Sequence, residues 1–374
     1  MTIRITGTGS ALPEKRVTNF DLEKLVETSD EWIQKRTGIA ERRISDGDTV
    51  STLAAMACKN ALEMAGKAAN EVDLIIVATC SPELLLPCCA CQVQDALGAS
   101  DAVAFDLNAA CSGFLFALNT ANAYLQTGIY KNALIVGSEV LSKLVDWNDR
   151  GTCILFGDGA GAAFMEASAE DIIRSNGRKA GMECMLQGSE GAKGMVLSCA
   201  ERAVNNAFMS GTQTEESPYI HMDGQEVYKF ATKQVPACIQ QALDKAGMTV
   251  EDVDWFMLHQ ANVRIIESVA KRLRVDIARF PMNIHKIGNM SYTEDEAGKT
   301  AQENDKKILM DGIEDFVSDF NEVYNDLCDI GGVSNLAYKK SLDSIVSANE
   351  DALKAIGITV SKSGELVIDQ KTLE

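Results

Sequence analysis

The sequence lacks the features that would mark a membrane-spanning or nucleic-acid-binding protein. No run of apolar residues approaches the ~20 needed to cross a bilayer, and the first residues lack the charged-then-apolar layout of a secretory signal. Basic residues are outnumbered, with 35 Lys and Arg against 54 Asp and Glu and a net charge of −19. Because nucleic acids require a basic surface, we expect neither a nucleic-acid partner nor a membrane, and a cytoplasmic location.

Histidine is also scarce. Only three histidines occur in 374 residues, and none lies near the cysteine cluster "PCCAC" that begins at Pro87. A zinc site there would need a second pair of ligands. The eleven cysteines are an odd number without regular spacing, so small buried thiols in a reducing compartment are the simpler interpretation. We therefore expect no metal site in this cluster.

Proline is absent after Pro281, and the composition changes shortly afterwards. From Tyr292 to the end, the chain carries 18 acidic and eight basic residues. Apolar residues three and four positions apart predict a helix over 309–327, and a second helix is expected over 335–355. The stretch "ITVSKSGELVID" alternates like a β-hairpin. We expect an acidic helical tail over 292–374 that ends in this hairpin.

The preceding part of the chain contains an internal repeat. "ALEMAGKAANEVDLIIVAT" from Ala61 and "ALDKAGMTVEDVDWFMLHQ" from Ala242 align without gaps at an offset of 181. Each copy predicts the end of an amphipathic helix, a glycine stop, a short loop and a buried strand. Short apolar strands that alternate with helices predict an α/β fold with a buried sheet. We expect two halves, 1–172 and 173–291, of which the second lacks its last two strands.

The stretch "DLNAACSGF" is the strongest candidate for chemistry. Cys111 lies where a predicted buried strand turns into a helix, so free N–H groups and the helix dipole favour a thiolate and a lowered pKa. Ala109, Ala110 and Gly113 leave room for an acyl group. A buried core thiol, as expected for Cys58, is the alternative.

A cysteine nucleophile that handles acyl groups needs partners for proton transfer or for a developing oxyanion. His259 is the first polar residue after the predicted strand "DWFML", and Asn289 follows the next one, near the repeat counterpart of Cys111. Two halves that face each other would bring all three residues to one cleft. A core histidine and a turn asparagine are the alternatives.

Several motifs in order resemble β-ketoacyl-acyl carrier protein synthase III, the initiating condensing enzyme of type II fatty acid synthesis. The resemblance covers residues 1–291 and rests on "GTGSALPE", "TSDEWIQKRTGIAERRI", "DLNAACSGF", "DRGTCILFGDGAGAA", "LHQANVRII" and "GNMS". It implies a thiolase-like αβαβα layered sandwich of two duplicated halves, and a homodimer. It also implies decarboxylative condensation of acetyl-CoA, or another short acyl-CoA, with malonyl-acyl carrier protein, a reaction without a metal or redox cofactor. Cys111 would hold the acyl group as a thioester, while His259 and Asn289 would hydrogen-bond the malonyl thioester oxygen.

The resemblance also assigns binding residues. The positions that hold CoA are Thr28, Trp32, Arg36 and Arg150. An indole and a guanidinium can hold an adenine by stacking, and arginine binds phosphate through two hydrogen bonds. A surface ion pair with Asp30 or Glu31 is the alternative for Arg36. Leu86 falls near the position that closes the acyl pocket from the other subunit.

A basic patch is expected beyond His259. Arg264, Lys271 and Arg272 share one face of a predicted helix. On so acidic a protein, this patch suits the docking of an acidic carrier protein. A solvated helix face is the alternative.

The resemblance ends after "GN". The family continues with a helix of small residues and two strands, whose glycine-rich turn supplies one of the two N–H groups of the oxyanion hole. Here "YTEDEAGKTAQENDKKILMDGIEDF" follows instead, and "LKAIGITVSKSGELVIDQKTL" resembles segments of flagellar filament capping proteins. A fused or misassembled reading frame, a natural chimera and a diverged tail stay open. The alternative functions are accordingly a catalytically impaired chimera that binds CoA or carrier protein, and an acyl-CoA hydrolase-like activity.

Overall fold

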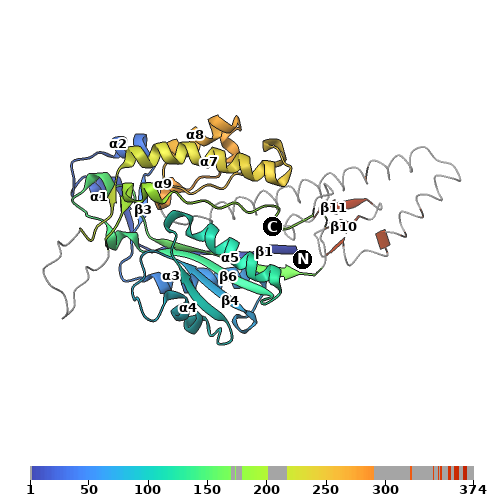
Figure 1. Ribbon diagram of the computed structural model, residues 1–374. Coiled ribbons are helices and arrows are strands. Elements are labelled where there is room, and N and C mark those ends of the chain that lie inside the picture. Colours follow the sequence, from blue (N-terminus) through green and yellow to red (C-terminus); the bar gives the residue numbers. More distant parts are fainter. Residues whose placement is uncertain are drawn as a thin grey trace. The chain divides into compact units, whose positions relative to one another are not determined.

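The computed structural model describes residues 2–169, 173, 179–200 and 217–289, and in the tail 321, 340, 344, 346–347, 353–354, 358–361 and 365–368. The chain divides into two compact units, Met1–Gly298 and Lys299–Glu374. The described elements of the first unit (Figure 1) are β1 (Thr2–Ala11), β2 (Arg16–Thr18), α1 (Asn19–Leu22), α2 (Asp30–Thr37), β3 (Glu41–Arg43), α3 (Val50–Ala65), η1 (Ala69–Glu71), β4 (Leu74–Ala78), α4 (Cys89–Leu97), β5 (Val103–Leu107), η2 (Ala110–Ser112), α5 (Gly113–Thr127), β6 (Asn132–Glu139), η3 (Leu141–Leu144), α6 (Arg150–Cys153), β7 (Gly159–Ser168), η4 (Gly191–Val196), β8 (Leu197–Ser198), β9 (His221–Met222), α7 (Gly224–Ala246), η5 (Val250–Asp252), α8 (Val263–Leu273), η6 (Ile277–Arg279) and α9 (Ile284–Ile287). Those of the second unit are β10 (Ile358–Val360) and β11 (Leu366–Ile368).

A five-stranded mixed sheet forms the centre of the first unit, in the order β1-β7-β6-β4-β5. Strand β4 pairs in parallel with both β5 and β6, whereas β7 is antiparallel to β6 and β1. The carboxyl ends of β4, β5 and β6 therefore lie at one edge of the sheet. Strand β4 is buried along its whole length, as a parallel strand must be when helices cover both faces.

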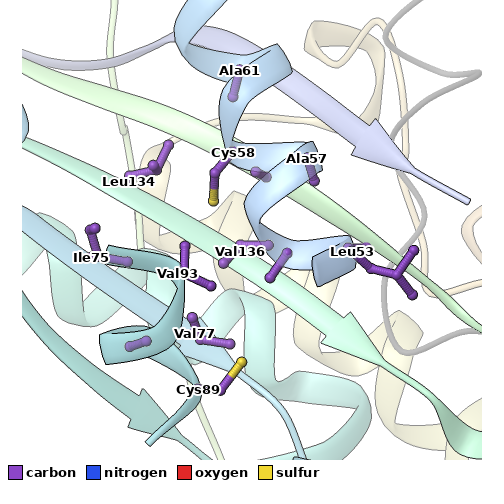
Figure 2. Packing of buried hydrophobic residues seen from close by; sticks show 14 of the residues in the cluster. Leu53, Ala57, Cys58, Ala61, Ile75, Val77, Cys89, Val93, Leu134 and Val136 are labelled. Atoms are coloured by element: carbon purple, nitrogen blue, oxygen red, sulfur yellow. The ribbon is translucent and has the colours of Figure 1, made fainter. Parts of the chain in front are cut away.

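Two apolar clusters hold the helices on the sheet. In β4, alternate side chains point to opposite faces, so Ile75 and Val77 join α3 and α4, while Leu74 and Ile76 join α5. Figure 2 shows the first cluster, in which Ile75 and Val77 lie among side chains of α3, α4 and β6. These two clusters build three layers, helix, sheet and helix, of the αβαβα sandwich that the resemblance implies.

The internal repeat is visible in the structure where the two copies begin. Helix α3 ends at Gly66 and helix α7 at Gly247, and both glycines have φ 64° and ψ 34°. This left-handed conformation favours glycine at a helix end. The 3₁₀ turns η1 and η5 follow, again 181 residues apart. The predicted glycine stops and the short loops therefore have the same geometry in both halves.

The second copy differs where its buried strand was predicted. Residues Trp255–Gln260 form no strand, although Phe256 donates its backbone N–H to the oxygen of Arg279 at 2.8 Å. Phe256 instead stacks on Phe280, with 4.9 Å between ring centroids, and packs against α8. A strand needs neighbours to satisfy its backbone groups. Within the described part of this half, 217–289, no sheet forms around this segment, so the strand prediction was wrong.

In the second unit, β10 and β11 pair as an antiparallel hairpin, with Ile358 opposite Ile368. The side chain of Asn321 bonds both backbone groups of Leu366, at 2.9 and 2.8 Å. Apart from Asn321, the helix predicted over 309–327 lies outside the described residues, and so does most of that predicted over 335–355. In the part of the chain that the structure describes, no helix is long and apolar enough to span a membrane.

Strand β1 and helix α3 approach each other closely at two glycines. A Cβ atom built on Gly9 would lie 2.3 Å from the backbone oxygen of Ala57. One built on Gly7 would lie 2.2 Å from the backbone oxygen of Ala61. Real Cβ atoms do not come so close to backbone atoms, so this packing requires glycine on the strand.

Replacing Gly9 by Ala is therefore expected to destabilise the protein. Overpacking of a close contact costs about 1–3 kcal/mol, which should appear as a lower midpoint of thermal unfolding. Gly188→Ala is the matched control, because a Cβ there meets no atom within 4 Å. Its effect should stay within about 0.5 kcal/mol. Equal effects of the two substitutions would contradict this account of the β1–α3 contact.

Candidate active site

Cys111 lies in the short turn η2, between the end of β5 and the start of α5. The preceding Ala110 has φ 45°, a conformation that costs a non-glycine residue of the order of 1–3 kcal/mol and that clusters at functional sites. The side-chain oxygen of Asn108 accepts from the backbone N–H of Ala110 at 3.4 Å. The strand-to-helix turn predicted from the sequence is therefore present, and it is strained directly before the thiol.

The electrostatics of Cys111 differ from the prediction. The residue is exposed to solvent, yet protein atoms surround its thiol on most sides. This desolvation, followed by the negative charge of Glu139, raises the pKa of Cys111 to about 11, while its backbone hydrogen bond acts in the opposite direction. Desolvation and Glu139 therefore outweigh the lowering of the Cys111 pKa that we predicted from the N-terminus of the helix. The thiol is protonated at neutral pH, so its attack on a substrate requires removal of that proton.

Glu139 is a buried acidic group that acts on the thiol of Cys111 and that the sequence analysis missed. It ends β6, is 2% exposed, and accepts hydrogen bonds from the Thr79 hydroxyl at 3.2 Å, the Cys80 backbone N–H at 2.9 Å and the Ser81 hydroxyl. Burial is the largest influence on its carboxyl and raises the pKa of Glu139. An acidic residue at the end of the apolar strand "NALIVGSEV" was the available signal, because such a position opens onto the edge where Cys111 lies.

His259 and Asn289 are paired in the structure. A side-chain hydrogen bond joins them, but burial has the larger effect and lowers the pKa of His259 to about 4. Its ring is therefore neutral at neutral pH. The Nε2 atom of His259 is buried and has no hydrogen-bond partner among the described residues. A buried polar atom without a partner is costly, and in an active site it is available to a substrate atom.

Backbone pairing brings Asn289 to the edge of the sheet where Cys111 lies. Asn289 donates its N–H to the oxygen of Leu155 at 2.8 Å and accepts from the N–H of Gly157 at 3.0 Å. Strand β7 begins two residues later, opposite the end of β6. Among the hydrogen bonds of the described residues, none joins Cys111 to His259 or Asn289. The structure thus pairs two of the three predicted catalytic residues and places the third at the same edge.

The residues predicted to hold CoA form a cluster around Trp32. The guanidinium carbons of Arg36 and Arg150 lie 5.1 and 4.9 Å from the centre of the indole ring. Arg150 also donates to the backbone oxygen of Glu27 at 3.0 Å. The hydroxyl of Thr28 is buried without a partner among the described residues. No ion pair in the described part of the chain involves Arg36, so stacking on Trp32 positions its charge.

The predicted basic face lies on α8. Arg264, Lys271 and Arg272 are all exposed, and Arg264 lies 5.8 Å from the ring centre of Tyr228. Helix α8 is joined to the Trp32 cluster because Asn262, its N-terminal cap, donates to the backbone oxygen of Arg36 at 3.0 Å. The basic face therefore begins beside the predicted CoA-binding residues.

Leu86 lies in the loop between β4 and α4 and is 86% exposed. Its neighbours Leu84 and Leu85 are exposed as well.

Comparison with known proteins adds to this geometry. The sequence matches the family described as 3-oxoacyl-[acyl-carrier-protein] synthase III over residues 105–181, and the C-terminal region of the same family over 243–294. It is 48% identical to β-ketoacyl-[acyl-carrier-protein] synthase III of Clostridium acetobutylicum over 290 residues, which are 77% of this chain and 86% of that protein. It is 47% identical to synthase III 1 of Bacillus cereus over 293 residues, 78% and 86% of the two chains. The crystal structure of the Aquifex aeolicus synthase III superposes with a TM-score of 0.68 at 42% identity, over 77% of this chain and 86% of that one.

The layered fold, together with these relatives, defines a thiolase-like condensing enzyme, an acyltransferase. Within that class, the chain belongs to the β-ketoacyl-[acyl-carrier-protein] synthase III family. Its function is accordingly the initiating condensation of fatty acid synthesis.

Replacing His259 by Gln, which takes up no proton, is expected to change how stability depends on pH. The folded-state pKa of His259 is about 4, below its ordinary 6.5. As the pH falls below 6.5, the unfolded chain protonates this ring while the folded protein does not. Wild-type stability should therefore fall relative to that of His259→Gln between pH 6.5 and about 4 and level off below. Thermal unfolding midpoints across this range provide the measurement.

His285→Gln serves as the control, because His285 is exposed. Its unfolding midpoint should run parallel to that of the wild type. The assignment of a neutral, enclosed His259 would be wrong if His259→Gln also ran parallel to the wild type over the whole range.

Proposed function

We propose that the chain transfers a short acyl group from acyl-CoA to Cys111 and then condenses it with malonyl-acyl carrier protein, giving a 3-oxoacyl-acyl carrier protein. The observation that carries this proposal is the position of Cys111. It is exposed, on a strained turn at the head of α5, at the sheet edge to which Asn289 is bonded. We further propose a cytoplasmic location, which suits the free thiols of the described chain.

In the first step, the sulfur of Cys111 attacks the carbonyl carbon of the acyl-CoA. The carbon–sulfur bond to CoA breaks, CoA leaves as a thiolate, and the proton of Cys111 passes to the leaving group. The raised pKa of Cys111 means that this proton is still present when the substrate arrives. The backbone N–H of Cys111 is one donor for the oxyanion that forms.

In the second step, the malonyl group loses CO₂, and its bonding electrons become an enolate. His259 and Asn289 are proposed to donate hydrogen bonds to the enolate oxygen. A neutral His259 keeps one N–H at neutral pH, and its enclosed Nε2 has no partner among the described residues. The carbanion then attacks the thioester carbonyl, and Cys111 leaves as a thiolate. Donors aimed at a charge that develops in a dry site contribute ~3–4 kcal/mol each.

Substrate binding is proposed to follow the Trp32 cluster and α8. The adenine of CoA would stack between Trp32 and a guanidinium, with Thr28, Arg36 and Arg150 near its phosphates. Both substrates carry their acyl group at the end of a long flexible arm. The link from Asn262 to Arg36 places the basic face of α8 beside this entrance, where an acidic carrier protein would dock.

We also propose that two copies of the chain associate. Strand β5 is at the edge of the sheet, and its Val103 is 47% exposed. An exposed strand edge with apolar side chains is a template for pairing with another chain. The exposed loop Leu84–Leu86 precedes α4, which packs on β5. In a dimer formed through β5, this loop would reach the partner, and Leu86 would close the partner's acyl pocket.

Labelled acetyl-CoA provides the test of the reaction. The wild type is expected to retain label on protein, and malonyl-acyl carrier protein should then convert it to labelled acetoacetyl-acyl carrier protein. Cys111→Ser should retain no label. Cys238→Ser is the matched control, since Cys238 is exposed on α7, and it should load as the wild type does.

The outcomes separate the proposal from its alternatives. If the wild type forms no acyl-enzyme, the result would favour the alternative of a chain that binds CoA or carrier protein without catalysis. Label released as acetate would indicate a hydrolase. Equal labelling of Cys111→Ser and the wild type would contradict the assignment of Cys111 as the nucleophile.

Charge reversal on α8 tests the docking face. Arg264→Glu is expected to raise the KM for malonyl-acyl carrier protein about fivefold, since one surface charge pair contributes up to ~1 kcal/mol. The KM for acetyl-CoA should stay unchanged. Lys59→Glu, which makes the same change of charge at an exposed site on α3, is the control. Equal effects on both substrates, or equal effects of both variants, would exclude the docking role.

A further inference from the structure

Two cysteines at the start of α4 lie in contact. The thiol of Cys88 donates to the sulfur of Cys91 with 3.4 Å between the two sulfur atoms. Cys88 is the N-terminal cap of α4 and Cys91 lies in its first turn. The two residues are also hydrogen-bonded through the backbone, since the N–H of Cys91 donates to the oxygen of Cys88 at 3.2 Å. Both residues are partly accessible to solvent.

The backbone of this turn is held from the neighbouring strand. The two carboxylate oxygens of Asp106, in β5, accept from the N–H groups of Cys89 and Ala90 at 2.8 and 2.7 Å. Residues three apart on a helix have Cβ atoms about 5–6 Å apart, whereas the Cβ atoms of a disulfide are about 3.5–4.5 Å apart. Closing a disulfide between Cys88 and Cys91 therefore draws their Cβ atoms closer by about 1 Å or more, in a turn whose intervening N–H groups are bonded to Asp106.

The other cysteines of the described chain are in different situations. Cys58 and Cys89 are fully buried in the cluster beneath α3 and α4, and burial raises the pKa of each thiol. Cys199 and Cys238 are exposed, but neither is hydrogen-bonded to a second cysteine among the described residues. Cys88 and Cys91 combine access with a partner thiol.

We propose that Cys88 and Cys91 are a redox-reactive dithiol that exchanges with small-molecule disulfides to form an intramolecular disulfide. One thiolate attacks a sulfur of the small disulfide and releases one small thiol, which leaves a mixed disulfide. The second cysteine then attacks the protein sulfur of that bond and releases the other small thiol. The protein loses two protons and two electrons, and the small disulfide is reduced to two thiols. The condensation mechanism uses neither residue.

The surroundings set the conditions for this exchange. The hydrogen bond from Cys88, then burial and the charge of Asp106, raise the pKa of Cys91. Since the thiolate is the attacking species, the exchange should be faster at mildly alkaline pH than at neutral pH. The second attack takes place between groups already in contact. Intramolecular reactions of oriented groups reach effective concentrations on the order of 10⁵ M, so the mixed disulfide should not accumulate.

The test uses the full-length protein and oxidised glutathione at mildly alkaline pH. After acid quenching, the protein is cleaved on the C-terminal side of Glu83 and Asp95. The resulting fragment, residues 84–95, contains Cys88, Cys89 and Cys91 and no other cysteine. Its mass is expected to fall by two hydrogen atoms, with no glutathionyl group attached. Dithiothreitol should restore the original mass.

Variants identify the cysteines involved. Cys88→Ser and Cys91→Ser should each lose the two-hydrogen shift and retain one glutathionyl group. Cys89→Ala is the matched control, because Cys89 lies between them on the buried side, and it should behave as the wild type does. A glutathionyl group retained by the wild type, a shift that vanishes in Cys89→Ala, or a disulfide between two protein chains would each overturn the proposal.

Discussion

The guanidinium of Arg42 joins the segments on which the position of Asn289 depends. Its side chain is fully buried and donates to the oxygens of Val17 and Ile154 at 3.1 and 3.0 Å and to the side chain of Asn19 at 2.8 Å. Burial lowers the pKa of Arg42 to about 10, so the group stays charged at neutral pH. Because a buried charge without compensation costs several kcal/mol, these three acceptors must stay in place, and the segments that carry them are fixed to β3.

The same junction fixes Asn289. Gly288 has φ 73°, and a Cβ there would lie 3.0 Å from the Cβ of Arg42, while a Cβ on Gly157 would lie 2.3 Å from the backbone oxygen of Ile287. Because both positions are glycine, the backbone at Gly288 can pass close to the backbone at Gly157 beside Arg42. At this crossing, the backbone of Asn289 forms its two hydrogen bonds to Leu155 and Gly157. The side chain of Asn289 is in turn hydrogen-bonded to His259. The backbone position of Asn289 is thus set by this crossing beside Arg42.

Local patterns in the sequence were sufficient for much of this structure. The apolar run of β4, the glycine stops at Gly66 and Gly247, and the turn that carries Cys111 follow from propensity and spacing over a few residues. The direction of the pKa shift of Cys111 did not follow, because Glu139 comes from a strand far along the chain and desolvation is a property of the assembled site. The strand predicted at "DWFML", residues 254–258, failed for the same kind of reason. Its apolar pattern is suited to a strand, but a strand also requires neighbours.

In the proposed reaction, the two chemical steps depend on different parts of the chain. Acyl transfer to Cys111 needs the turn η2, its backbone N–H and the edge of the five-stranded sheet, all of which belong to the layers around α3, α4 and α5. The proposed decarboxylation needs His259 and Asn289, and the backbone of Asn289 is held beside the Arg42 junction by its bonds to Leu155 and Gly157. A substitution at Arg42 would therefore impair the second step and leave the environment of Cys111 unchanged. Formation of the acyl-enzyme is the more robust of the two steps, because its parts are built into one continuous core.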